Sequence, residues 1–101
     1  MERWAIFEVV ASGKMEDYKA WFEARDKRFQ ELGMARLTLY EVSSRTQNMV
    51  CVVTPEMTAE AAEQWSAQYG ADDVIRGLAE ERREKKVLLD GTTEFFRLIE
   101  V

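Results

Sequence analysis

Histidine is absent from the 101-residue sequence, and cysteine and proline occur once each. The absence of histidine excludes a Cys₂His₂ zinc site, a histidine-ligated haem and any catalytic triad or dyad with an imidazole base. A single cysteine excludes a disulfide within the chain and a Cys₄ zinc site. Because that residue, Cys51, lies in a β-branched run, we interpret it as a small buried apolar side chain.

Long apolar runs are also absent. The longest, residues 49–53, has five residues, whereas a helix that crosses a membrane needs about 20. The residues after Met1 do not form a basic segment followed by an apolar one, so we expect a cytoplasmic protein with no membrane partner. The glycines are scattered rather than gathered in a phosphate-binding loop, and the acidic residues lack the spacing of a hard-cation site. We therefore expect neither a cofactor nor a metal.

Basic residues are the minority, 14 against 19 acidic ones, which gives a formal charge of −5. The one basic cluster, Arg82, Arg83, Lys85 and Lys86, is interleaved with glutamates, as is typical of a solvated helix face. Since affinity for nucleic acid is built from cations that neutralise phosphates, we expect no nucleic-acid partner.

Apolar residues make up 47% of the chain and charged residues 33%, as in a folded globular protein, and the length fits one domain over residues 1–101. Strand-forming residues dominate four segments, 3–11, 34–43, 49–54 and 92–101. The middle two are joined by a polar turn at 45–48, which predicts an antiparallel hairpin. Residues 87–89 are ambiguous.

Helical spacing connects a row of large side chains in residues 17–32, which predicts a helix that Asp17 caps and Gly33 ends. A second helix is expected to begin after Thr58, end at Gly70, and resume after Asp72 or Asp73. The order of elements is therefore strand, helix, strand, strand, broken helix, strand. That is the α+β, ferredoxin-like β-α-β-β-α-β arrangement, a four-stranded antiparallel sheet with helices on one face.

Each expected strand is apolar on both faces, although the helices of one chain cover only one face of the sheet. A monomer would leave some eight to ten large apolar side chains uncovered, forgoing about 10–30 kcal/mol of burial. Two-fold dimers are the commonest oligomers. We therefore expect a homodimer, a dimeric α/β barrel, that forms through the free sheet face.

Four segments of the chain resemble proteins of the dimeric α/β-barrel superfamily, including antibiotic-biosynthesis-monooxygenase-like proteins. These are Asp-Tyr-Lys-Ala-Trp at 17–21, Leu-Thr-Leu-Tyr-Glu at 37–41, Ala-Glu-Ala-Ala-Glu-Gln-Trp at 59–65 and Glu-Phe-Phe-Arg-Leu at 94–98. The resemblance implies that ligands bind between helices and sheet. Members of this superfamily include cofactor-independent oxygenases of aromatic compounds, haem-degrading enzymes, isomerases and cyclases, and many proteins with no known activity, so the resemblance implies no single reaction. Haem branches with a histidine ligand do not fit this sequence.

Three residues are candidate catalytic groups. Glu8 interrupts an apolar strand, and a carboxylate in such surroundings can act as a general base. Its alternative role is an ion pair with Arg97 or Arg36. Arg97 could hold a ligand carboxylate or enolate, and Tyr40 could orient a ligand or donate a proton. Alternatively, Arg97 could form a cross-strand ion pair, and Tyr40 could be a core aromatic residue with a solvated hydroxyl.

Four further residues are candidate ligand contacts. Trp21 and Trp65 lie on the expected inner helix faces and could wall a planar ligand, or simply fill the core. Tyr18 offers a hydroxyl and Arg36 a cation. Arg25 lies within the apolar stripe of the first helix, where its stem could pack while its head reaches a carboxylate.

Three functions remain open. The first is a cofactor-independent monooxygenase, isomerase or cyclase of a small aromatic or polyketide-like compound. The second is a protein that binds a small apolar molecule without turnover. The third is an interaction protein with no ligand. A cavity of a few hundred Å³ with aromatic walls and converging polar groups would favour the first two, and a filled core the third.

Overall fold

The computed structural model describes residues 1–43 and 46–101. Its elements confirm the expected order, with the second helix in two parts. They are β1 (Glu2–Val10), α1 (Met15–Leu32), β2 (Thr38–Val42), β3 (Asn48–Val53), α2 (Ala59–Ala71), α3 (Asp73–Glu84) and β4 (Glu94–Ile99). Arg45, the first residue of the expected hairpin turn, lies outside the described residues.

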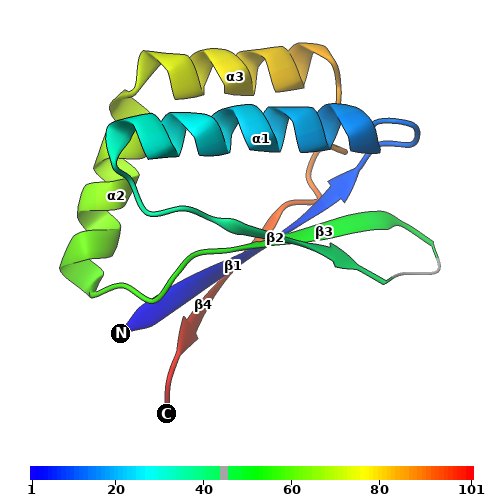
Figure 1. Cartoon of the computed structure of the whole chain (residues 1–101). Helices are drawn as coiled ribbons and strands as arrows, with labels where there is room; N and C mark the ends of the chain where they lie inside the picture. The colour runs from blue at the N-terminus through cyan, green and yellow to red at the C-terminus, as the bar shows by residue number, and fades with distance from the viewer. Residues whose placement is uncertain (44–45) are drawn as a thin grey trace.

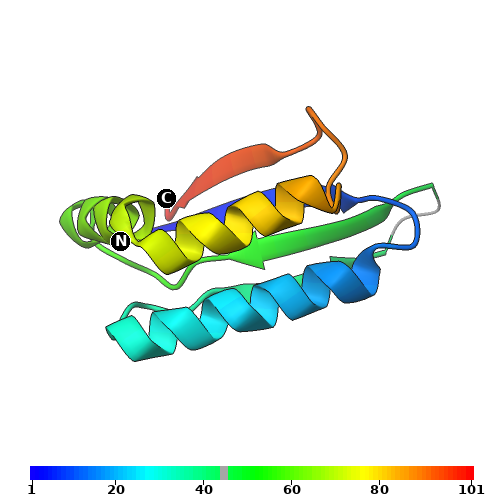
Figure 2. The same cartoon turned by 90° about the horizontal axis from the view of Figure 1, so that it is seen from above.

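The strands form one antiparallel sheet in the order β2-β3-β1-β4. The helices lie on one face of it (Figure 1), so the expected ferredoxin-like fold is confirmed. Seen from above, α1 and α3 run alongside each other over the sheet, and β4 lies beyond them (Figure 2). Every residue of β4 is accordingly exposed in the single chain.

The first helix begins three residues earlier than the sequence predicts, at Met15 rather than after a cap at Asp17. The Tyr18 N–H donates to the Lys14 carbonyl at 2.9 Å, so the first turn closes over 14–18 and Asp17 lies inside it rather than at its cap. The prediction of Asp17 as cap was therefore wrong, although its carboxylate still favours the positive end of the helix dipole. Gly33 ends the helix as predicted, with a left-handed φ of 67°.

The second helix is broken at Asp72, not at Gly70 as predicted. The α2 segment continues to Ala71, and the extended backbone of Asp72 (φ −81°, ψ 122°) then separates it from α3. Both side-chain caps are confirmed, since Thr58 accepts from the Ala61 N–H at 3.1 Å and Asp72 from the Ile75 N–H at 3.0 Å.

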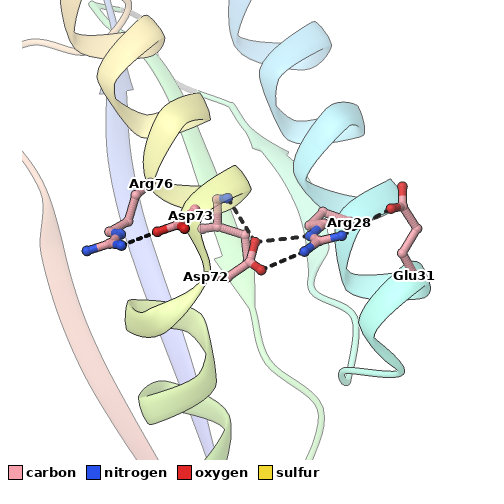
Figure 3. A network of polar contacts seen from close by, with 6 residues as sticks. Arg28, Glu31, Asp72, Asp73 and Arg76 are labelled. Carbon is pink, nitrogen blue, oxygen red and sulfur yellow. Dashed lines mark hydrogen bonds and ion pairs between the residues drawn. The ribbon is translucent and has the colours of Figure 1, made fainter.

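Asp72 also connects this junction to the first helix (Figure 3). Its two carboxylate oxygens accept from Nε and Nη2 of Arg28, at 3.0 and 2.7 Å. The Arg28 guanidinium, which also contacts Glu31, holds the pKa of the Asp72 carboxyl below its usual value. One carboxylate therefore caps α3 and ties it to α1.

The strand ends also differ from the prediction. β2 begins at Thr38 rather than residue 34, because Met34 and Leu37 turn into the core beneath the helices. The ambiguous residues 87–89 are not a strand, but Leu88 forms an isolated antiparallel bridge with Val10 at the end of β1. β4 is shorter than predicted at both ends.

Buried side chains between sheet and helices form two clusters. One consists of Val10, Tyr18, Trp21, Val50 and Val87, and the other of Phe29, Met34, Leu37, Val52 and Ile75. Both lie on the helix-facing side of the sheet. Of the described residues, none belongs to a helix long and apolar enough to span a bilayer.

The far face of the sheet is apolar as expected, but fewer of its side chains are uncovered than expected. Cys51 is buried, as are Ala5 and Val9, because these small side chains sit on the two central strands between flanking neighbours. Burial raises the pKa of the Cys51 thiol. The exposed apolar side chains of this face include Tyr40, Phe96 and Leu98, each 45–56% exposed.

Candidate functional site

A cavity of about 480 Å³ lies between the sheet and the helices. Its size falls in the range of small-molecule sites, roughly 300–1,000 Å³. Apolar and aromatic side chains dominate its wall, among them Trp4, Ile6, Leu37, Trp65, Tyr69 and Phe95. Phe95 is 64% exposed and belongs to β4, so the cavity opens at the edge that the helices leave uncovered.

Glu8 reaches this cavity because strand side chains alternate between faces. It shares the helix-facing side of β1 with Trp4 and Ile6, lines the cavity and is only 7% exposed. The Tyr18 hydroxyl donates a hydrogen bond to Glu8 Oε1 at 3.0 Å. The alternative ion pairs do not form, since Arg97 contacts Glu2 and Arg36 contacts Asp26.

Tyr18 holds its proton firmly. Burial raises the pKa of its hydroxyl far above the ordinary value, and the neighbouring Glu8 carboxylate raises it further, against opposing effects of Arg25 and Arg82. The neutral phenol is therefore a permanent donor to Glu8 at physiological pH. Tyr18 does not line the cavity, so it positions Glu8 rather than contacting a ligand there.

Arg25, on α1, lines the cavity and is 6% exposed. Its Nη1 donates to the Tyr69 hydroxyl at 3.1 Å, while its Nε and Nη2 have no hydrogen-bond partner in the described part of the chain. The guanidinium carbon lies 4.1 Å from the ring centroid of Trp21 and 5.3 Å from that of Phe22. Each such contact contributes about 0.5–2 kcal/mol, so aromatic rings stabilise a charge that has no ion-pair partner within residues 1–43 and 46–101.

An aromatic wall is provided by α2. Trp65 stacks on Tyr69 with ring centroids 5.2 Å apart, and its Nε1 donates to the Ala35 carbonyl at 2.9 Å. Trp65 thus lies where the sequence predicted a wall for a planar ligand. Trp21 instead faces α3, where it lines a smaller pocket and lies 4.5 Å from the Arg82 guanidinium.

Besides Tyr18 and Trp21, three more of the predicted site residues do not line the cavity. Tyr40 pairs with Cys51 across the strands and so belongs to the far face. Arg36 binds both Asp26 oxygens, at 2.9 and 2.7 Å, and thereby lowers the pKa of that carboxyl. Arg97, on the edge strand β4, lies 3.8 Å from the Glu2 carboxylate on the neighbouring strand β1.

The structure therefore brings Glu8, Tyr18 and Trp65 together, and adds two cations that were not predicted as site residues, Arg25 and Arg82. A cation within the aromatic stripe of the first helix was the sequence signal for Arg25. Arg82 looked like one charge of a solvated cluster. Within residues 1–43 and 46–101, no group of Cys, Asp or Glu side chains is arranged to hold a metal ion.

No protein-family model matches the sequence, and no curated protein sequence matches it. Solved structures do match its fold. An uncharacterised NIPSNAP domain protein from Burkholderia xenovorans has a TM-score of 0.78 at 15% identity, over 100% of this chain and 95% of that one. The chain therefore has the same ferredoxin-like fold as these solved structures.

Two further structures have this fold. A NIPSNAP family protein with unknown function from Agrobacterium tumefaciens has a TM-score of 0.77 at 12% identity, covering 97% of this chain and 86% of its own. An antibiotic biosynthesis monooxygenase has a TM-score of 0.70 at 7% identity, covering 100% and 99%. At such identities the likeness concerns the fold, and function has to be argued from the site.

Proposed function

We propose that this protein is a cofactor-independent enzyme that removes a proton from a small aromatic or polyketide-like compound, with Glu8 as the general base. The observation that carries the proposal is a buried carboxylate in the wall of an aromatic cavity of about 480 Å³. Positioned bases of this kind accelerate proton transfer about 10²–10⁴-fold. The protein with antibiotic-biosynthesis monooxygenase activity in its name has the same fold, which agrees with this class of chemistry.

Glu8 is suited to the step because its two oxygens differ. Oε1 accepts the Tyr18 hydrogen bond, which fixes the carboxylate and leaves Oε2 to take a proton from carbon. The C–H bond breaks, its electron pair delocalises into the ring and carbonyl of the substrate, and the proton resides on Glu8. In an isomerisation or cyclisation the proton then returns to another atom of the substrate.

An oxygenation would use the same first step with dioxygen as the co-reactant. The carbanion forms a C–O bond to dioxygen, and the proton on Glu8 completes a hydroperoxide. Loss of water from that group leaves a carbonyl, so one CH₂ and one O₂ give one C=O and one H₂O. The protein's own contribution is the base and an apolar cavity.

The test uses beta-tetralone, a bicyclic ketone with an acidic benzylic C–H. Exchange of that hydrogen for solvent deuterium is followed by proton NMR. We expect the wild-type protein to accelerate exchange and Glu8→Gln to lose the acceleration. The matched control is Glu41→Gln, which removes an exposed strand carboxylate that forms an ion pair with Lys19. Equal exchange rates with wild type and Glu8→Gln would refute the proposal.

A binding protein without turnover is the second candidate. It is favoured by the Tyr18 hydrogen bond, which satisfies part of the Glu8 carboxylate within the chain. Under this alternative beta-tetralone binds in the cavity but exchanges no faster than in buffer. An interaction protein with a filled helix–sheet space does not fit a cavity of this volume.

We also propose that two copies associate through the far face of the sheet. Three large side chains there, Tyr40, Phe96 and Leu98, are about half exposed. Covering them would contribute about 2–5 kcal/mol per copy, at 1.5–3 kcal/mol for a fully buried side chain. A second copy offers the matching face by symmetry. The expected cytoplasmic location stays a prediction.

A further inference from the structure

The charged side chains of the cavity do not balance one another. Three line it, namely Glu8, Arg25 and Arg82, in a chain whose overall charge is −5. Over residues 1–43 and 46–101, neither arginine takes part in an ion pair, and the hydrogen-bond partner of Glu8 is the neutral Tyr18. An acidic protein therefore contains a cavity with one positive charge in excess.

Arg25 shows which group could balance that charge. Arg28 binds the Asp72 carboxylate through its Nε and Nη2, and Arg36 binds the Asp26 carboxylate through the same two nitrogens. Figure 3 shows the first of these pairs. In Arg25 these same two nitrogens, and only these, lack an acceptor in the described part of the chain. Nε and Nη2 of Arg25 form a fork of two parallel donors that matches the two oxygens of a carboxylate, and this fork has no acceptor among the described residues.

The surroundings of Arg25 explain why the protein itself does not fill the fork. Aromatic rings of Trp21, Phe22, Phe29 and Tyr69 lie within 6.0 Å of its guanidinium carbon. Rings attract the cation but accept no strong hydrogen bond. A buried, charged donor without an acceptor is unfavourable, so an incoming carboxylate would gain two charge-assisted hydrogen bonds there.

We propose that the ligand of this cavity is an aromatic carboxylate, with its charged group on Arg25, supported by Arg82, and its ring against Trp65 and Tyr69. The inference rests on the proposed function for the existence of a ligand site in the cavity, and it adds that the ligand carries a negative charge. Both free nitrogens of Arg25 are enclosed, so binding includes a shift of the side chains around them.

Isothermal titration with naphthoate and with naphthamide tests the inference, because the two probes share one aromatic frame and differ in charge. We expect wild-type protein to bind naphthoate about tenfold more tightly or better. Arg25→Met, which keeps the length of the buried stem, should abolish the preference. Arg82→Gln, on a partly exposed side chain, should reduce it. Arg83→Gln alters the exposed neighbour on the same helix and should change nothing.

Circular dichroism and thermal melts show whether each variant is folded. If Arg25→Met does not fold, the partly exposed Arg82→Gln still tests the inference. Equal affinity for the two probes, no binding of either, or a preference that survives in the folded arginine variants would overturn the inference. Glu8→Gln separates it from the proposed function, because that variant should lose deuterium exchange while binding naphthoate at least as tightly as wild type.

Discussion

Replacing Tyr18 by phenylalanine tests whether Glu8 is held as the structure indicates. The change removes one hydroxyl from a fully buried ring, and with it a single hydrogen bond of 3.0 Å to the Glu8 carboxylate. Hydrogen bonds to charged groups contribute about 1.5–3 kcal/mol, and their loss leaves a buried carboxylate short of a donor. We expect Tyr18→Phe to lower the free energy of unfolding by about 2 kcal/mol, or roughly 8–16 °C in melting temperature for a chain of this size.

A double-mutant cycle with Glu8→Gln identifies the source of that loss. In the Glu8→Gln background the lost bond is neutral and contributes about 1 kcal/mol, so the coupling energy should be at least about 1 kcal/mol. Urea unfolding at one protein concentration is the assay, since association would make stability concentration-dependent. Tyr40→Phe, the same change on the far face, keeps the ring that the proposed dimer covers and should stay within about 0.5 kcal/mol of wild type.

The same variant has an expected signature in alkali. The pKa of Tyr18 is raised above its ordinary value of 10.0 in the folded protein, so the unfolded chain releases this proton first as the pH rises. The stability contributed by the neutral phenol is complete below pH 10 and declines above it. Tyr18→Phe should remove that part of the decline. If Tyr18→Phe were as stable as the wild-type protein at neutral pH and showed no coupling energy with Glu8→Gln, our account of this hydrogen bond would be refuted.

Two further predictions concern the assembly and the helix junction. Light scattering should show wild-type particles of twice the 11.8 kDa chain mass, and Leu98→Glu on the far face should convert them into monomers. The control Val74→Glu changes an equally exposed apolar side chain on α3 and should leave the particles intact. A monomeric wild-type protein would contradict the proposed dimer. Asp72→Asn should lower the melting temperature at neutral pH and weaken the loss of stability on acidification. The pair with Arg28 depresses the pKa of Asp72, so it contributes stability that is present above the unfolded pKa of about 3.8 and is lost below it. An unchanged dependence of the melting temperature on acid pH would contradict this prediction.

The order of strand and helix signals was enough to predict the fold, and the alternation of strand residues put Glu8 on the same face of β1 as Trp4 and Ile6, as the structure has it. A charged residue on an otherwise apolar strand face has to lie where the helices cover it or where a partner meets it, and β1 is a central strand. The same alternation gave Tyr40 a face but did not show which face the helices cover. Its cavity role therefore could not be judged from the sequence.

Charge pairing was the part that sequence could not supply. The partner of Arg36 is Asp26, on the preceding helix, and the partner of Arg28 is Asp72, 44 residues away. Which cations are satisfied and which are free depends on the packing of α1 against α3. For this reason Arg36 and Arg97 were expected to be able to hold a ligand, whereas the two unfilled donors of the buried Arg25 are seen only in the structure, within the residues that it describes.

The central claim is that the Glu8 carboxylate acts as a base inside the cavity, and deuterium exchange of beta-tetralone tests it most directly. We predict exchange catalysed by the wild-type protein and by Glu41→Gln, and a rate lower by about 10²–10⁴-fold with Glu8→Gln. We expect naphthamide to bind in the same aromatic cavity, so that a saturating concentration suppresses the wild-type rate. Exchange that is equally fast with Glu8→Gln, or that naphthamide leaves unchanged while bound, would contradict the account.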